Sequence, residues 1–345
     1  MVEKPKKINI AFNGFGRIGR NLVRKLISDD RYNIVAINAR TTVDVRAHLF
    51  KYDSIYGKYQ GEVSYELDNL IIDGHTIPNF DRRTPIKLPW GELEVDFVID
   101  SSGKFTSKHD LEQHIEAGAK NVIVTSPAKD VDATLVFGVN ESSYKVQETN
   151  IISASSCTTT CLTPILKVLL KNFGIKQGTM TTVHSFTMGQ SLLDSSNSDL
   201  RRARSATMSI IPTTTGAAQN VGIVIPELEG KLDGLAIRVP VPNVSLLDLT
   251  IELEQDTIME DILAVFEKEK KLHGILCVSY EPLVSVDYIG DSCSAIVDSL
   301  SSKMVNKRLL QLIAFYDNEY GYCCRVLDLL QYIAKKLPQP LTPSK

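Results

Sequence analysis

The stretch "KINIAFNGFGRIGRNLVRKLISDDRYNIVAIN", residues 7–38, decides the fold class of the chain. Its first seven residues have a β-rich apolar content and predict a strand, and residues 32–38 predict a second, buried strand. Between them, Ile18, Leu22 and Leu26 recur at helical spacing and form one apolar stripe. A strand, a helix and a second strand in this order are typical of a parallel sheet covered by helices.

The turn between the first strand and the helix carries Gly14, Gly16 and Gly19 in G-x-G-x-x-G spacing. The first glycine permits a tight turn, the second lets the backbone approach a pyrophosphate, and the third lets helix and strand pack closely. The helix N-terminus then faces the anion. Three plain turn glycines would be the simpler interpretation, but the strand before and the helix after the motif favour a dinucleotide-binding turn.

The second strand ends at Ala39 and Arg40, where a dinucleotide-binding domain usually places an acid that bonds the adenosine ribose. Without a carboxylate there is no repulsion against a 2′-phosphate, and the adjacent guanidinium can pair with one. We therefore expect NADP to be accepted as well as NAD. The alternative is that NAD binds without this contact and that Arg40 is a solvated surface residue.

The rest of the chain divides into two regions. Residues 95–128 repeat the strand–helix–strand alternation. Long alternating segments follow residue 151 and predict a mostly antiparallel sheet with helices on one face. The fold class is therefore α/β: a Rossmann-type dinucleotide-binding domain plus an α+β catalytic domain. We expect the first domain over 1–156 and the second over 157–318, with a C-terminal helix, 319–337, packing back on the first. Strands are expected in 178–187, 234–255 and 283–290.

Composition excludes several classes of protein. The 345 residues carry a formal net charge of −3, which speaks against nucleic acid as the main ligand. The sequence has no run of the ~20 apolar residues that a membrane helix needs, and its start lacks the apolar core of a signal peptide. Its six cysteines are sparse and form no C-x-x-C pair. We expect reduced thiols in the cytoplasm and no metal site.

Two of the cysteines open an apolar helical stretch that follows a run of hydroxyl residues. Cys157 stands at the predicted helix start, where unpaired N–H groups lower a thiol pKa, and is the candidate nucleophile. Cys161 lies one turn further in and is expected to be buried. His184, in the hydroxyl-rich "TTVHSFT", is a candidate base. Packed, inert thiols are the alternative, and spacing alone does not choose among the six histidines.

Longer motifs connect these pieces. They include "SCTTTCLTP" (156–164), "TTVHS" (181–185), "RRAR" (201–204), "IIPTTTGAA" (210–218), "AIRVPVPNVSLLDL" (236–249) and "YDNEYGY" (316–322). Together with "NGFGRIGR" (13–20) and "FKYDS" (50–54), they resemble the motifs of one family, phosphorylating glyceraldehyde-3-phosphate dehydrogenase. The resemblance covers essentially the whole chain. Closely related enzymes, notably erythrose-4-phosphate dehydrogenase, share most of these motifs.

The resemblance implies a reversible oxidoreductase reaction of glycolysis and gluconeogenesis. Cys157 attacks the substrate aldehyde to give a thiohemiacetal, with His184 as its base. Hydride passes to NAD or NADP and leaves a thioester, which inorganic phosphate cleaves to an acyl phosphate, 1,3-bisphosphoglycerate. In the erythrose-4-phosphate alternative the thioester is hydrolysed. A third alternative is a binding protein of the same fold that has lost its chemistry. The resemblance also implies a homotetramer.

The resemblance further assigns the remaining site residues. The attacking phosphate or its counterpart on the substrate is bound by Ser156, Thr158, Arg204, Thr215 and Gly216. The substrate's own phosphate is anchored by Thr187 and Arg238. The nicotinamide carboxamide is held by Asn318, with Tyr322 near its ring. Further cofactor contacts are assigned to Arg17, Ile18, Arg83, Ser102 and Ser126.

The chain departs from the family pattern at several positions. Thr160 replaces the usual Asn, and Gly189 stands where many members have a second phosphate-binding threonine. The segment "LDSSNSDLRRAR" (193–204) is shorter than usual and resembles that of photosynthetic members, in which a serine at the position of Ser196 reaches the 2′-phosphate of a neighbouring subunit's cofactor. Ala39 and Ser196 therefore both favour NADP competence.

Overall fold

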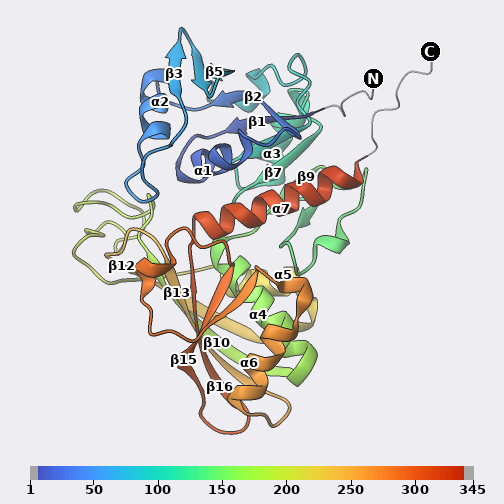
Figure 1. Ribbon diagram of the computed structural model, residues 1–345, viewed down its shortest axis with the longest axis vertical. Helices are drawn as coiled ribbons and strands as arrows, with labels where there is room; N and C mark the ends of the chain where they lie inside the picture. The colour runs from blue at the N-terminus through green and yellow to red at the C-terminus, as the bar shows by residue number, and fades with distance from the viewer. Residues whose placement is uncertain (1–6, 338–345) are drawn as a thin grey trace. The chain divides into compact units, whose positions relative to one another are not determined.

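The computed structural model describes residues 7–337, which form two compact units (Figure 1). The N-terminal unit comprises the chain up to Phe137, Glu141–Ser155 and the chain from Val326 on. The C-terminal unit comprises Gly138–Asn140 and Ser156–Arg325. Among the helices within residues 7–337, none combines the length and the apolar character needed to cross a bilayer.

A nine-stranded sheet with the order β3-β4-β5-β2-β1-β6-β7-β9-β8 forms the N-terminal unit. All its pairs are parallel except β3–β4 and β4–β5, which form an antiparallel meander at one edge. The strands are β1 (Ile8–Asn13), β2 (Tyr32–Asn38), β3 (Val63–Glu66), β4 (Asn69–Ile72), β5 (His75–Phe80), β6 (Phe97–Asp100), β7 (Asn121–Val124), β8 (Ala133–Thr134) and β9 (Ile151–Ser153). The helices are α1 (Arg17–Leu26), α2 (Val43–Lys51), α3 (Lys108–Glu116) and, in part, α7 (Tyr320–Lys336).

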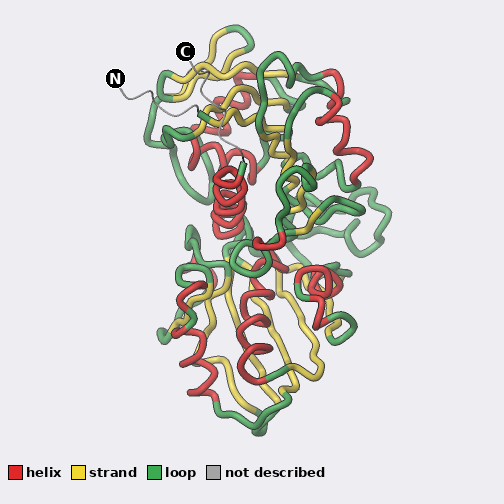
Figure 2. The backbone as a smooth tube through the Cα atoms, turned by 90° about the vertical axis from the view of Figure 1, so that its right-hand side faces the viewer, coloured by secondary structure: helices red, strands yellow, loops and turns green. Residues whose placement is uncertain are grey.

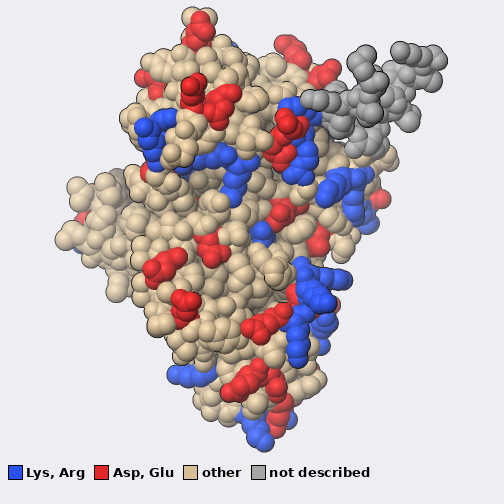
Figure 3. Space-filling model, viewed as in Figure 1, with Lys and Arg blue, Asp and Glu red and all other residues tan. Residues whose placement is uncertain are grey.

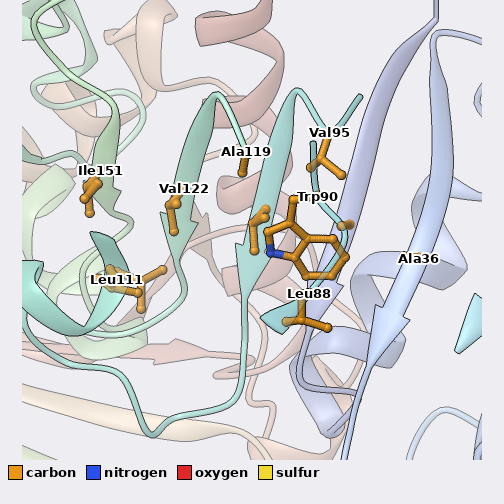
Figure 4. Close-up of a cluster of buried hydrophobic side chains, with 11 residues drawn as sticks. Ala36, Leu88, Trp90, Val95, Leu111, Ala119, Val122 and Ile151 are labelled. Carbon is orange, nitrogen blue, oxygen red and sulfur yellow. The ribbon is translucent and has the colours of Figure 1, made fainter. Parts of the chain in front are cut away.

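The core of this unit packs against the central strands. Trp90 is fully buried in a cluster with Leu88, Val95 and Val122, and Leu111 of α3 joins the cluster from the helix side (Figure 4). The continuous burial of β6 and β7 is the pattern expected of parallel strands that are covered on both faces. The predicted parallel sheet with covering helices is thus confirmed.

The strand order places a topological switch point between β1 and β6. From β1 the chain crosses to β2 on one side, and it later returns to β6 on the other side. In open parallel sheets, ligands bind outside the carboxyl ends of the strands at such a point. The glycine turn of residues 14–19 directly follows β1 and therefore lies at this point.

A seven-stranded, mostly antiparallel sheet forms the C-terminal unit, with the order β11-β12-β10-β13-β16-β15-β14 (Figures 1 and 2). Helices α4, α5 and α6 pack on its strands. The strands are β10 (Ile175–Ser185), β11 (Ile211–Thr213), β12 (Leu232–Val239), β13 (Ser245–Leu253), β14 (Leu276–Ser279), β15 (Ala295–Met304) and β16 (Leu309–Tyr316). The helices are α4 (Cys157–Phe173), α5 (Ala217–Val224) and α6 (Met259–Lys268).

One strand prediction is wrong. Residues 283–290 form a loop with a 3₁₀ turn, Ser285–Tyr288, instead of a strand. The Asp287 carboxylate accepts the backbone N–H of Val284 at 2.9 Å, so the chain folds back on itself locally. A carboxylate that bonds a nearby backbone N–H competes with strand pairing, and this overrides the apolar alternation.

The expectation that all six thiols are reduced is also wrong in the structure. Cys277 on β14 and Cys293, in the loop before β15, form a disulfide across a sequence separation of 16. Because β14 pairs with β15 in parallel, the start of β15 lies beside Cys277, and the chain that enters β15 brings Cys293 within reach. Sequence spacing alone did not indicate this pairing.

Candidate functional site

A cavity of about 680 Å³ opens at the switch point of the N-terminal unit. Its wall includes the glycine turn, the end of β2, the segment after β5 and the segment after β6. Six of the lining residues are cations and none is an acid. The cations are Arg20, Arg40, Arg46, Arg82, Arg83 and Lys104. The cavity is therefore suited to an anionic ligand.

The glycines of the turn have the geometry that the motif predicts. Gly14 has a φ of +103°, and a Cβ there would lie 2.5 Å from the backbone N of Ser102. A Cβ on Gly19 would lie 2.6 Å from the Gly14 carbonyl oxygen. Gly16 is the N-cap of α1 and faces open space, because a Cβ there would meet nothing within 4 Å. The first and third glycines thus permit close packing, and the second leaves the N-terminus of α1 open to a ligand.

A buried polar network lies at the carboxyl ends of β1, β2 and β6. Asn38 donates to Asn13, and Asn13 donates to Asp100 at 2.7 Å. The indole N–H of Trp90 donates to His114 Nδ1 at 3.0 Å. Because an indole N–H only donates, His114 Nδ1 is the acceptor, and the proton of the imidazole is on Nε2. Nε2 lies 3.2 Å from Asp100 Oδ2 and donates to it. This network fixes the three strand ends that carry the cavity.

Of the ten cofactor residues expected in the N-terminal unit, six line the cavity: Gly14, Gly16, Ala39, Arg40, Arg83 and Ser102. Arg17, Ile18, Gly19 and Ser126 do not. Arg82, beside the predicted Arg83, also lines the cavity and was missed. Its backbone N–H donates to the Asn38 side chain at 2.8 Å, a tertiary contact that sequence does not reveal.

The candidate thiol and base lie together in the C-terminal unit. Cys157 is the first residue of α4, and Ser156 caps that helix by accepting the N–H of Thr159 at 3.1 Å. Cys157 Sγ lies 3.5 Å from His184 Nε2, near the end of β10. Cys157 is partly exposed and Cys161 is fully buried. The geometry therefore permits proton transfer between Cys157 and His184.

Arg238 of β12 lies on the other side of the imidazole. β12 pairs with β10 in register, so that Arg238 is directly opposite His184. Arg238 Nη1 lies 2.6 Å from His184 Nδ1 and donates to the Ser185 carbonyl at 2.9 Å. Nδ1 also lies 2.7 Å from that carbonyl. With the proton on Nε2, Nδ1 accepts from Arg238; with the proton on Nδ1, it donates to the Ser185 carbonyl. Arg238 therefore influences which nitrogen carries the proton.

Burial dominates the electrostatics of this group. Desolvation, followed by the positive charge of Arg238, lowers the pKa of His184 to about 3. Burial raises the pKa of Cys157, and Arg238 and hydrogen bonds at Thr158 only partly oppose it. The lowered thiol pKa expected from the helix N-terminus is therefore not found, because desolvation is the larger effect. Both pKa shifts favour the uncharged forms, a neutral thiol beside a neutral imidazole.

A second layer of side chains supports the pair. Tyr316 packs edge-on against His184 with ring centroids 6.1 Å apart, and its hydroxyl bonds to Thr158 and Thr182. Sequence reasoning missed this role, although Tyr316 opens the "YDNEYGY" motif. Asn318 Oδ1 accepts from the hydroxyls of Ser185 and Ser245. Because both bonds are accepted by the side-chain oxygen, the amide nitrogen of Asn318 is the group that donates.

Comparison with known proteins decides the family. The family model of the glyceraldehyde 3-phosphate dehydrogenase NAD binding domain matches residues 8–108 of this chain. The family model of the C-terminal domain matches residues 156–318. Glyceraldehyde-3-phosphate dehydrogenase 2 of Bacillus subtilis (strain 168) is 48% identical over 97% of this chain and 99% of its own length. The Geobacillus stearothermophilus enzyme is 48% identical over 95% and 99%, and enzyme 2 of Trichormus variabilis is 47% identical over 95% and 99%.

The chain belongs to the glyceraldehyde-3-phosphate dehydrogenase family. The N-terminal cavity thus lies in the family's NAD-binding domain, and Cys157, His184 and Arg238 lie in its C-terminal domain. The resemblance found in the sequence is confirmed.

Other residues that the resemblance to this dehydrogenase family assigns have local partners in the structure. Arg204 Nε donates to Asp194 at 2.9 Å, and the Thr187 hydroxyl donates to Gln190 at 3.2 Å. Thr215 Oγ1 accepts the N–H of Ala217 at the start of α5, where Gly216 is the N-cap. Ser196 is exposed, and Tyr322 is buried. The roles of all these residues stay predictions.

Proposed function

We propose that this dehydrogenase oxidises glyceraldehyde 3-phosphate to an acyl phosphate, using Cys157 as the nucleophile and His184 as its base. The observation that carries the proposal is the 3.5 Å approach of Cys157 Sγ to His184 Nε2 at the N-terminus of α4. The relatives quoted above bear the name glyceraldehyde-3-phosphate dehydrogenase, which favours this substrate over erythrose 4-phosphate. A thiol, a base and a buried arginine held together also argue against a binding protein without chemistry.

Arg238 supports the proposed anchoring of the substrate phosphate. Its guanidinium is largely buried, its hydrogen bonds go to neutral groups, and its Nε has no partner among residues 7–337. A buried cation without a paired anion is costly, so a phosphate dianion would be bound favourably here. Thr187 is the proposed second anchor.

Anion binding would also prepare His184 as a base. When a phosphate draws the Arg238 guanidinium away from Nδ1, that nitrogen is free to donate to the Ser185 carbonyl, 2.7 Å away. The Nε2 lone pair then faces Cys157 Sγ and can take its proton as sulfur attacks the aldehyde. Neutralising Arg238 also removes a charge that lowers the pKa of His184.

The later steps use the same residues. A nicotinamide cofactor, when bound, supplies the acceptor for the hydride that leaves the thiohemiacetal, and a thioester on Cys157 remains. Inorganic phosphate then attacks this thioester and expels Cys157 Sγ. We propose that Ser156, Thr158, Arg204, Thr215 and Gly216 bind the attacking phosphate. For Arg204 this requires exchange of its Asp194 partner, an exposed pair that costs little to break.

The cation-lined cavity fits a dinucleotide: Gly16 leaves the start of α1 open to a pyrophosphate, and no acid lines the wall. We propose that Gly14, Gly16, Arg17, Ile18, Gly19, Ala39, Arg83, Ser102, Ser126, Asn318 and Tyr322 take part in holding it. We further propose that NADP is used as well as NAD, because Ala39 has no carboxylate to repel a 2′-phosphate. Ser196 is the proposed contribution of a neighbouring subunit.

Steady-state turnover tests these proposals. We expect turnover of glyceraldehyde 3-phosphate with both NAD and NADP, strict dependence on inorganic phosphate, and much slower turnover of erythrose 4-phosphate. Phosphate-independent turnover would favour hydrolysis and the erythrose-4-phosphate alternative. Cys157→Ser should abolish turnover while cofactor binding persists, with Cys324→Ser as the control. Undiminished turnover of Cys157→Ser would refute the mechanism.

We also propose a cytoplasmic location, because the reaction needs Cys157 as a free thiol, which it is in the structure. Fractionation of the source cells checks this.

A further inference from the structure

Arg46 is a buried cation that the reaction scheme does not use. It lies on α2, is 3% exposed and lines the cofactor cavity. Its guanidinium donates to Asn79 Oδ1 at 2.6 Å, to the Ala39 carbonyl at 2.6 Å and to the Phe80 carbonyl at 3.1 Å. None of these three acceptors carries a charge. Arg46 Nε has no hydrogen-bond partner among residues 7–337.

A buried guanidinium in this state is unfavourable unless an anion compensates its charge. Burial lowers the pKa of Arg46, and the charges of Asp81 and Asp68 oppose this only in part. An arginine stays protonated even so. The cavity wall therefore holds a fixed positive charge, hydrogen-bonded to the residue that stands in place of the ribose-binding acid.

Arg40, the residue that sequence reasoning favoured as a phosphate partner, is differently placed. Its Nη1 forms an ion pair with Asp81 Oδ1 at 2.6 Å, and both side chains are about half exposed. A 2′-phosphate would have to compete with that carboxylate for Arg40. Water and salt also screen Arg40, whereas Arg46 is shielded from both.

We propose that Arg46 is the residue that selects for a phosphate on the adenosine ribose, because it supplies a buried positive charge, hydrogen-bonded only to neutral acceptors, at the Ala39 end of the cavity. This inference rests on the proposed use of NADP. Ala39 removes the repulsion, and Arg46 supplies the attraction. Arg46 also forms hydrogen bonds to Ala39, which follows β2, and to Asn79 and Phe80 at the end of β5. These bonds hold its charge at the cavity.

Calorimetric titration of NAD and NADP into the wild type, Arg46→Gln, Arg46→Lys and Arg40→Gln tests the inference without turnover. We expect Arg46→Gln to weaken NADP binding about tenfold and NAD binding less than about threefold. Arg46→Lys keeps the charge and should retain most of the NADP affinity. Arg40→Gln should change the ratio of the two affinities by less than about threefold.

The affinity ratio separates charge from folding, because a loosened fold weakens both cofactors alike. An unchanged ratio in Arg46→Gln, or a larger change in Arg40→Gln, would overturn the role of Arg46 while NADP use itself stands. Wild-type protein that binds NAD but not NADP would overturn both the proposed NADP use and this inference. Wild-type protein that binds neither cofactor would contradict the proposed dehydrogenase itself.

Discussion

His184, the proposed catalytic base, lowers the stability of the fold at acid pH. Its imidazole is 4% exposed, and burial together with Arg238 lowers its pKa to about 3 from an ordinary 6.5. Between these two values the unfolded chain binds a proton that the folded chain does not. Stability therefore falls as the pH falls below about 6.5.

The acid sensitivity of the fold should decrease when this imidazole is removed. The linkage slope approaches about 1.4 kcal/mol per pH unit, so the wild type should lose roughly 2 kcal/mol between pH 6.5 and 5 through His184 alone. The His184→Asn variant should lose roughly 2 kcal/mol less unfolding free energy than the wild type over the same pH range. Denaturant unfolding at both pH values, at one protein concentration, measures this. Equal losses in both proteins would mean that His184 is protonated in the fold.

Gly14 and Gly16 differ in what a methyl group would meet. Gly14→Ala would place Cβ 2.5 Å from the Ser102 backbone at a φ of +103°, whereas Gly16→Ala would meet nothing within 4 Å. We expect Gly14→Ala to lower the melting temperature markedly. Gly16→Ala should melt like the wild type but bind NAD at least about tenfold more weakly, because its methyl group blocks the approach of the pyrophosphate. Unimpaired NAD binding by Gly16→Ala would contradict the proposed contact.

At the scale of elements, the ends of the strands position the side chains of both candidate sites. In the N-terminal unit, β1, β2 and β6 end in Asn13, Asn38 and Asp100, whose side chains bond one another. In the C-terminal unit, the in-register pairing of β10 with β12 sets His184 against Arg238. Register decides both arrangements, because a shift by one residue would turn these side chains to the opposite face.

The Trp90–His114 bond should be measurable as stability. Trp90→Phe would leave His114 Nδ1 buried without its donor, at a cost of about 1–3 kcal/mol beyond that of the smaller ring. The double variant Trp90→Phe/His114→Leu removes donor and acceptor together and should recover part of the loss. Denaturant unfolding of the single and double variants completes the cycle. Strict additivity would argue against the bond.

The disulfide ties the loop of residues 284–294 to the edge strand β14. In the chain-entropy model, a closed loop of about 15 residues stabilises the fold by about 3 kcal/mol. Cys277→Ser should therefore unfold at clearly lower denaturant than the wild type, and a reductant should shift the wild type to the same midpoint. Cys324→Ser, which removes a free thiol, is the control. A midpoint that does not respond to reductant would show that the bond is absent in solution.

At the scale of the whole molecule, charged and apolar side chains are unevenly distributed over the surface. Charges of both signs are interspersed on the face drawn in Figure 3. Within residues 186–210, by contrast, large apolar side chains are 70–98% exposed: Met188, Leu192, Leu193, Leu200, Met208 and Ile210. An exposed apolar group of this kind is typical of a protein interface. We propose that this segment contributes to a homotetramer.

A negative charge introduced into residues 186–210 should weaken the association of subunits. Leu193→Glu or Met208→Glu should lower the mass found by light scattering below that of a tetramer, because an interface that buries apolar surface would have to desolvate a carboxylate. Leu67→Glu, at a residue 85% exposed in the other unit, is the control. A monomeric wild type would refute the proposed assembly.

Short-range periodicity and contiguous motifs in the sequence are enough to predict the class of fold, the glycine turn and Cys157 as the candidate thiol. His184 is chosen as the candidate base among six histidines only through the resemblance to a family. Only the tertiary structure decided what depends on contacts between distant segments. Arg238 meets His184 through strand register, Arg46 reaches Ala39 from the next helix, and Cys277 on β14 meets Cys293 in the loop before β15. Burial likewise reversed the expected direction of the Cys157 pKa, since desolvation depends on everything packed around the group and not on its neighbours in sequence.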